Sequence, residues 1–129
     1  MAIKKYFVSE DKFGNIGWYK DAACTILHRE DGPAVVTFDG TKYWYQNDLR
    51  HREDGPAVEY ITGSEEWYLN GKRHRTDGPA ISYDTGYRYW YINGVPMTEA
   101  EFLAATQPVV EMTVADIEKL VGKRVKIIK

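Results

Sequence analysis

The 129-residue sequence has one cysteine, no long apolar run and no excess of charge of either sign. Because the lone Cys24 cannot close an internal disulfide, we expect a reducing compartment, the cytoplasm. No segment approaches the length of a membrane-spanning helix, and no apolar signal region follows the first residues, so we expect no membrane association. A net charge of −2 predicts no general nucleic-acid binding, because such binding requires a basic excess.

A tandem repeat of 23 residues occupies the centre of the chain. Three copies align without a gap, at 28–50, 51–73 and 74–96, and a degenerate copy at 6–27 precedes them. Each full copy opens with His-Arg-x-Asp-Gly-Pro-Ala and reaches Trp-Tyr-x-Asn near its end. A fixed period without insertions indicates one structural unit stacked on itself. The expected division is a repeat sheet over 1–97 and a C-terminal segment over 98–129.

Each copy predicts two short strands rather than a helix pair. Runs such as Pro-Ala-Val and Lys-Tyr-Trp-Tyr are separated by glycine-containing turns. The mid-repeat glycines Gly40, Gly63 and Gly86 supply the positive φ of a tight hairpin, and Asp-Gly-Pro supplies a second reversal. Two reversals per copy predict a mainly β fold, an antiparallel meander of about seven or eight strands built from β-hairpin repeats.

Alternation along the second strand divides the aromatic residues into two rows. Trp44 points away from Tyr43 and Tyr45, and the later copies repeat the pattern. One row is Trp44, Trp67 and Trp90; the other is Tyr45, Tyr68 and Tyr91, edged by Tyr43 and Tyr89. Because both faces carry aromatics, we expect a helix, a second subunit or a ligand to cover the second face. With the open sheet edge, this predicts a homo-oligomer.

The C-terminal segment predicts two short helices and a strand. Residues 98–101 form a capping box for the first helix. Thr113 is a good N-cap for the second helix, and Gly122 is a natural residue for its C-terminus. Residues 123–129 alternate as a basic strand. This segment could cap the sheet edge, pair with a partner chain or form a small module.

Residues 28–96 resemble the HREDGPA-type repeats of proteins of tailed bacteriophages and some bacteria. They are more loosely similar to MORN repeats, which share the period and the paired short strands. The resemblance covers about half the chain and rests on the His-Arg-Glu-Asp-Gly-Pro-Ala string, while Trp-Tyr-x-Asn-Gly replaces the aromatic-Glu-Gly pattern of MORN repeats. It implies a viral origin and the cytoplasm of a host cell. By analogy, small phage proteins often act on host defence, and some sequester cyclic-nucleotide signals.

The opening motif has a structural and a functional interpretation. The motif aspartates Asp31, Asp54 and Asp77 would cap their own turns and pair with the neighbouring arginine. Identical use in every copy favours this structural role, since a unique site must break the repeat symmetry. Arg52 and Arg75 remain candidates for phosphate, because a planar fork of donors suits that group.

Metal binding and catalysis find little support in the sequence. The histidines of the three copies would stand about 9 to 10 Å apart on neighbouring hairpins, too far to share one zinc ion. Nothing resembles a nucleophile elbow, a glycine-rich phosphate loop or a dinucleotide fingerprint. We therefore predict no catalytic residue, no metal and no cofactor; hydrolysis by paired carboxylates stays open, although no pair stands out.

The tyrosine row is the best candidate for a ligand surface. A tyrosine beside a cation, as in Lys42-Tyr43 and Arg88-Tyr89, can stack on a base and neutralise its phosphate. The second copy has Glu65-Glu66 instead, and a ligand site would use such asymmetry. The candidate ligand-binding residues are Tyr43, Tyr45, Tyr68, Tyr89, Tyr91, Lys42, Arg88, Arg52 and Arg75.

These features predict a non-enzymatic, phage-encoded binding protein that sequesters a nucleotide-type small molecule, such as a cyclic-nucleotide immune signal. The first alternative is a MORN-like interaction scaffold that binds a host protein through the repeat face. The second alternative is an enzyme of unknown chemistry.

Overall fold

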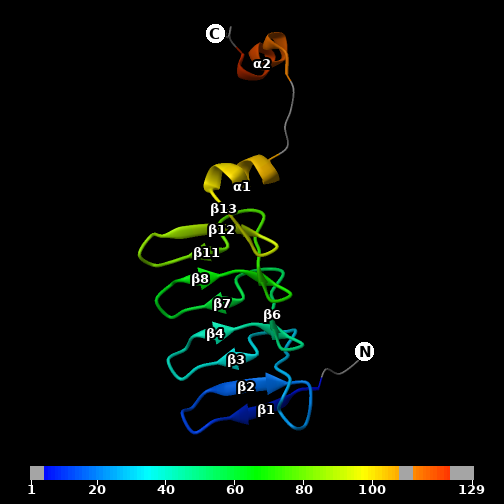
Figure 1. Cartoon of the computed structure of the whole chain (residues 1–129), viewed down its shortest axis with the longest axis vertical. Coiled ribbons are helices and arrows are strands. Elements are labelled where there is room, and N and C mark those ends of the chain that lie inside the picture. Colours follow the sequence, from blue (N-terminus) through cyan, green and yellow to red (C-terminus); the bar gives the residue numbers. More distant parts are fainter. Residues whose placement is uncertain (1–4, 108–111, 123–129) are drawn as a thin grey trace.

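Hairpins stacked in one column form most of the molecule in a computed structural model that describes residues 5–107 and 112–122 (Figure 1). The strands are β1 (Phe7–Glu10), β2 (Ile16–Tyr19), β3 (Val35–Val36), β4 (Lys42–Tyr43), β5 (Tyr45–Gln46), β6 (Leu49–Arg50), β7 (Val58–Glu59), β8 (Glu65–Glu66), β9 (Tyr68–Leu69), β10 (Lys72–Arg73), β11 (Ile81–Ser82), β12 (Arg88–Ile92) and β13 (Val95–Met97). Helices α1 (Glu99–Thr106) and α2 (Val114–Val121) follow.

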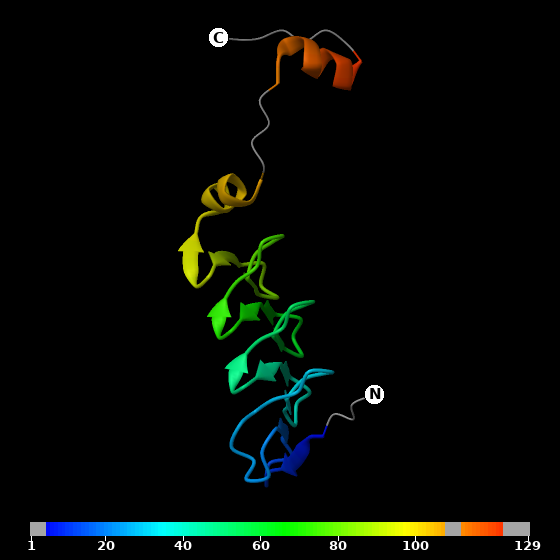
Figure 2. The same ribbon diagram turned by 90° about the vertical axis from the view of Figure 1, so that its right-hand side faces the viewer.

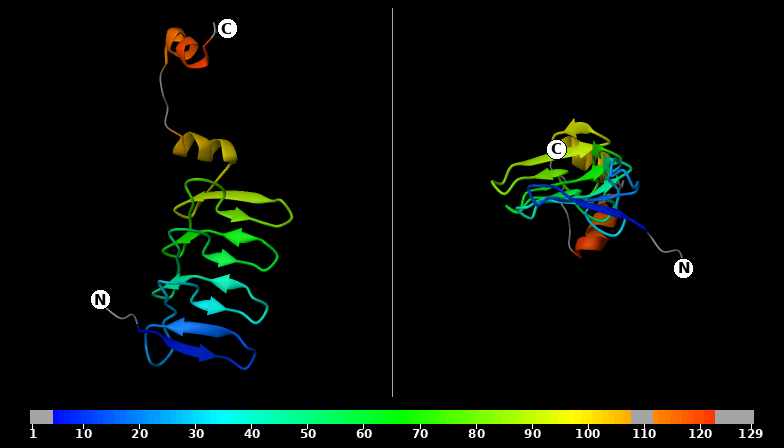
Figure 3. Two further views of the ribbon diagram at one scale, coloured as in Figure 1. Left: turned by 180° about the vertical axis from the view of Figure 1, so that it is seen from behind. Right: turned by 90° about the horizontal axis from the view of Figure 1, so that it is seen from below.

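The strands form a main sheet and two small side sheets. The main sheet is antiparallel in the order β1-β2-β3-β4-β7-β8-β11-β12-β13, and β5 pairs with β6 and β9 with β10 in two-stranded sheets. Seen along the column, successive hairpins lie over one another (Figure 3, right). The predicted mainly β meander of hairpin repeats is therefore confirmed.

The chain reverses three times in each repeat, and the expected two reversals were one too few. The first turn places Gly40, Gly63 and Gly86 at φ of 93°, 96° and 98°. The missed reversal is a two-residue hairpin turn in which Asn70 and Gly71 both have positive φ, 49° and 80°. Asn-Gly is a strong hairpin signal, but the alternation of the aromatic run before it predicts one continuous strand. The Asp-Gly-Pro loop makes the third reversal and crosses to the next copy.

Backbone hydrogen bonds join each copy to the next at short range. The N–H of Trp44 donates to the carbonyl of Ala57 at 2.7 Å, and Trp67 donates to Ala80 at the same distance. Both alanines, like Ala34, are fully buried. A larger side chain has no space at this point, because interiors are close-packed. This explains why each copy has alanine after its proline.

The apolar core is narrow and lies within the stack. Val58 is fully buried and packs with Ala57 and Tyr68, and partly buried Tyr43, Trp44 and Tyr60 surround this cluster. The tryptophans are half-buried rather than enclosed. Sheets of two-residue strands bury few large side chains, so contacts between side chains of successive copies also contribute to stability.

Both predicted helices begin at the expected caps. The Thr98 side chain accepts from the backbone N–H of Glu101 at 3.1 Å, and the Glu101 carboxylate accepts from the N–H of Thr98 at 3.2 Å. Thr113 and Asp116 form a second capping box, and Gly122 ends α2 at φ 69°. Helix α1 ends at its C-cap Gln107, whose backbone N–H donates to the Leu103 carbonyl. The strand expected at 123–129 lies outside the described residues. No helix in the described ranges has the length and apolarity that a membrane crossing requires.

Helix α1 covers the C-terminal end of the stack (Figures 1 and 2). It packs against β12 and β13, and Phe102 is 4% exposed in this contact. Of the possibilities left open for the C-terminal segment, capping the sheet edge is the one that α1 adopts.

The left-handed turn residue Asn70 gives a test of the missed hairpin. Replacing it by β-branched valine should lower the free energy of unfolding by about 1 to 2 kcal/mol, because L-residues other than Gly, Asn and Asp disfavour positive φ. Asn70→Gly should have a free energy of unfolding close to that of the parent, because glycine adopts positive φ readily. Gln46→Val is the control, because it introduces the same side chain within strand β5 and not at the turn. Urea denaturation measures all three, and an unchanged Asn70→Val variant would contradict the assigned turn.

Candidate functional site

A ladder of tyrosines and arginines lies along one face of the stack. We define the Tyr–Arg ladder as Tyr45, Arg50, Tyr68, Arg73 and Tyr91. In each hairpin the tyrosine and the arginine are cross-strand partners, Tyr45 with Arg50 and Tyr68 with Arg73; Pro96 replaces arginine opposite Tyr91. Cross-strand partners share a face, so the second hairpin of each copy builds this surface.

The ladder arginines bridge successive copies. The Arg50 Nε donates to the Tyr45 hydroxyl at 3.3 Å, and the guanidinium carbon lies 5.4 Å from the ring centre of Tyr68 in the next copy. Arg73 repeats this arrangement, 3.3 Å from the Tyr68 hydroxyl and 5.4 Å from the ring centre of Tyr91. Such cation–π contacts contribute about 0.5 to 1 kcal/mol at exposed sites.

One carboxylate, Glu66, lies on the same face. Glu66 is 6% exposed, accepts from the Tyr60 hydroxyl at 2.8 Å and lies 3.8 Å from Arg73 Nη2. Burial and the hydrogen bond to Glu66 raise the pKa of Tyr60 above its ordinary value, so its phenol stays a neutral donor. Within the described residues, Arg50 contacts tyrosines and no carboxylate. It is therefore the ladder cation with the most capacity for an anion.

A shallow hollow of about 270 Å³ lies at the third-copy end of the ladder. Its lining is Tyr68, Gly71, Lys72, Arg73, Tyr91 and Gly94. Two cations and two aromatic rings thus meet around one hollow. This combination suits a flat group that carries negative charge.

A second column of stacked residues covers the opposite face. We define the Trp–Arg column as Trp18, Arg29, Trp44, Arg52, Trp67 and Arg75. The guanidinium carbon of each motif arginine lies over the tryptophan ring of the preceding copy, at 4.3, 4.0 and 4.0 Å from the ring centre. Arginines of the chain itself therefore stack on rings of both aromatic rows.

The motif arginines are held by many contacts. Arg52 bonds to Asp54 at 3.1 Å, to the Pro56 carbonyl at 3.1 Å and to Glu59 at 2.9 Å. A Cβ on Gly55 would lie 2.7 Å from its guanidinium carbon, so the glycine lets the guanidinium approach the loop. Equivalent pairs join Arg29 to Asp31 and Arg75 to Asp77, which confirms the predicted Arg–Asp pairing. The bond from Arg75 lowers the pKa of Asp77.

Each motif histidine holds the hairpin turn of its own copy. His51 Nδ1 accepts from the backbone N–H of Asn70 at 3.0 Å, and His28 and His74 make the same bond at 3.0 and 2.9 Å. Each therefore satisfies one donor of an asparagine turn. The described residues contain no group of His, Cys, Asp or Glu that could hold a metal ion.

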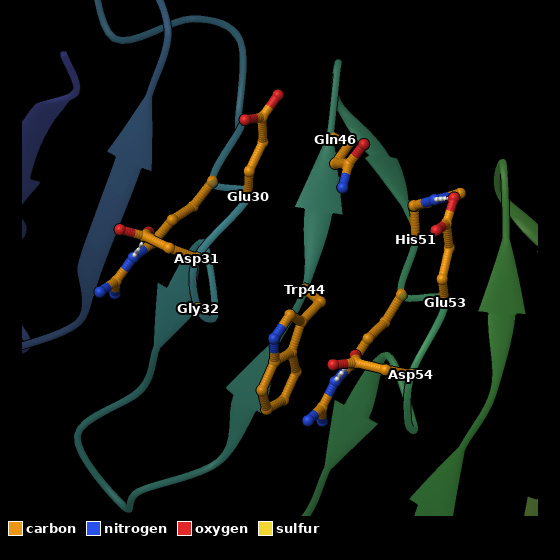
Figure 4. A pocket seen from close by; sticks show the side chains of 10 residues that line it. Glu30, Asp31, Gly32, Trp44, Gln46, His51, Glu53 and Asp54 are labelled. Carbon is orange, nitrogen blue, oxygen red and sulfur yellow. Dashed lines mark hydrogen bonds and ion pairs between the residues drawn. The ribbon is translucent and has the colours of Figure 1, made fainter. Parts of the chain in front are cut away.

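A hollow of about 530 Å³ separates two successive motif loops (Figure 4). Glu30 and Asp31 lie on one side, Glu53 and Asp54 on the other, and Trp44 stands between them. Four carboxylates face two arginines that already have partners. Such a groove repels phosphate, so the ladder face is the better candidate for an anionic ligand.

The structure gathers only part of the predicted ligand set. Tyr45, Tyr68 and Tyr91 lie together on the ladder, and Tyr43 and Tyr89 stand on the same face. Lys42 and Arg88 are exposed but project to the opposite face, because consecutive strand residues alternate. Lys42-Tyr43 and Arg88-Tyr89 therefore do not act as pairs on one surface. Arg52 and Arg75 belong to the Trp–Arg column.

Sequence reasoning missed Arg50 and Arg73, the cations of the ladder. Both close their copies, directly before the next histidine, and Pro96 takes this position in the third copy. The signal was the Asn-Gly turn, since a two-residue hairpin at that turn pairs Tyr68 with Arg73. Comparison of the chain with protein-family models, curated proteins and solved structures finds no match.

Exposed apolar residues mark the tips of the first hairpin in each copy. We define the tip strip as Phe13, Phe38, Ile61 and Tyr87, which are 67%, 83%, 70% and 66% exposed. Phe13, Phe38 and Ile61 lie in the turns of successive hairpins, and Tyr87 follows the next turn, directly before β12. These turns follow one another along one edge of the stack (Figure 1). The Phe38 ring reaches over the preceding turn, where a Cβ on Gly14 would lie 3.2 Å from it. Large exposed apolar side chains gathered along one edge are typical of surfaces that contact other proteins.

Removing Arg52 tests whether the motif arginines belong to the structural frame. Arg52→Ala should lower the free energy of unfolding by about 1 to 2 kcal/mol, through loss of its stacking and hydrogen bonds. Arg52→Lys should recover little of the lost free energy of unfolding, because an ammonium lacks the planar fork of donors of a guanidinium. Arg88→Ala is the matched control at an exposed site. Urea denaturation measures each variant, and full rescue by lysine would count against a structural role for the guanidinium.

Proposed function

We propose that this chain is a non-enzymatic binding protein whose Tyr–Arg ladder holds a nucleotide-type small molecule. The observation that supports the proposal is Arg50, a cation between tyrosine rings that contacts no carboxylate among the described residues. Aromatic rings stack on bases, and a guanidinium matches the geometry of phosphate. The ladder offers both groups on one face.

The spacing of the ladder favours a ligand with two phosphates. Arg50 and Arg73 occupy the same position in successive copies, and copies are two strands apart, about 9 to 10 Å. A cyclic dinucleotide carries two phosphates and two bases, so it can engage both arginines and stack on tyrosines. Together with the resemblance to phage repeats, this supports sequestration of a cyclic-nucleotide immune signal as the role of the protein.

Isothermal titration against a panel of cyclic di- and trinucleotides tests the proposal. Binding of at least one member is expected, and Arg50→Gln and Arg73→Gln should each weaken it about tenfold or more, since a charged hydrogen bond contributes about 1.5 to 3 kcal/mol. Arg88→Gln, an exposed arginine on the opposite face, should bind like the parent. No binding across the panel would overturn the proposal. Recovery of a chemically altered ligand by mass spectrometry would point to an enzyme instead.

A second candidate function is that of an interaction scaffold for a host protein, and the tip strip favours it. Four large apolar side chains exposed along one edge are suited to a partner with a complementary apolar groove. The tip strip and the ladder comprise different residues, so substitutions distinguish the two functions.

The scaffold function predicts a stoichiometric partner that can be reassembled from purified components. Phe38→Ser together with Ile61→Ser should abolish the complex, while Arg50→Gln should leave it intact. Size-exclusion chromatography with light scattering measures both. A complex that survives the double substitution, or that requires Arg50, would exclude the tip strip as its contact.

A further inference from the structure

The two ends of the stack differ in how their sheet edges are protected. At the C-terminal end α1 covers β12 and β13, and Pro96 lies within β13. Helices and prolines are common means of blocking an edge strand. At the other end β1 is the outermost strand, and within the described residues it pairs only with β2. In the part of the chain that the structure describes, the C-terminal edge is therefore covered and no strand lies beside the β1 edge.

The hydrogen bonds of Trp18 identify the backbone groups on the open edge. The backbone N–H of Trp18 donates to the Ala34 carbonyl at 2.7 Å, and the Trp18 carbonyl accepts from the backbone N–H of His28 at 3.0 Å. Both groups therefore face away from β1. Val8 is the register partner of Trp18. When one residue of an antiparallel pair directs its N–H and C=O away from the other strand, its partner does the same. The N–H and C=O of Val8 therefore point away from β2, toward the outer edge. Because backbone groups alternate along a strand, those of Glu10 point the same way.

We infer that a second copy of this chain pairs its β1 with β1, antiparallel, about a two-fold axis at Val8. Val8 then exchanges both backbone hydrogen bonds with Val8 of the second copy. Glu10 lies opposite Tyr6 of the second copy, and Lys5 lies opposite Asp11 of the second copy. The pairing thus places opposite charges beside each other at both ends. A two-fold contact uses the same patch twice, and this strand is complementary to itself.

This dimer gives the ladder a larger surface. Residues that face each other in an antiparallel pair project to the same side, so the two-fold axis runs perpendicular to the sheet. The ladder faces of both copies then lie on one side of a continuous sheet. Arg50 and Arg73 are presented twice on that side.

Analytical ultracentrifugation of the full chain tests the pairing without any ligand, so its outcome is independent of the proposed function. The parent should sediment as a dimer. Val8→Pro should sediment as a monomer, because proline has no N–H to donate, while Val8→Ala should remain a dimer. The outward direction of the Val8 N–H leaves the β1–β2 hydrogen bonds intact, and an unchanged far-UV circular dichroism spectrum checks this. A monomeric parent, or a dimeric Val8→Pro variant, overturns the inference.

Symmetric cross-linking tests the register directly. In a Cys24→Ser background, Val8→Cys should form an intermolecular disulfide on oxidation, since hydrogen-bonded antiparallel partners have Cα atoms about 5.5 Å apart, within disulfide range. Ile61→Cys in the same background is the exposed control and should stay uncross-linked. Equal cross-linking at both positions would indicate random collision and would contradict the two-fold pairing at Val8.

Discussion

The stacking of each motif arginine on the tryptophan of the preceding copy is the contact on which the repeat column depends. Arg52 covers Trp44 at 4.0 Å and also holds the Pro56 carbonyl and Asp54 of its own loop. One side chain thereby joins two copies and fixes the loop that crosses between them. Because strands of two residues bury little surface, contacts of this type substitute for a wide apolar core.

The space and hydrogen bonds that this contact needs explain most of the residues that are identical in the three copies. Gly55 leaves space for the guanidinium, Ala57 lets the next backbone approach, and His51 accepts from the turn of Asn70. Each residue type answers a steric or hydrogen-bonding need that recurs with the repeat. The residues shared by all copies therefore have structural roles, and they give little information about a ligand.

The two faces of the sheet have different capacities because their arginines have different partners. Arg52 on the Trp–Arg column is paired with carboxylates, whereas Arg50 on the Tyr–Arg ladder contacts tyrosines. A guanidinium without a carboxylate partner still attracts an anion strongly, whereas carboxylates partly neutralise the charge of a paired one. This contrast, rather than the number of aromatic residues, directs attention to the ladder face.

The sequence by itself determined the repeat, the antiparallel meander, the two capping boxes and the separation of tryptophans from tyrosines, because periodicity, turn residues and alternation act locally. It did not assign Arg50 and Arg73 to the ladder, since their neighbours depend on a second hairpin that pairs residues across the Asn-Gly turn. It also grouped Lys42 with Tyr43, which alternation places on opposite faces. Only the tertiary structure decided which cation lies over which ring, because stacking joins residues of different copies.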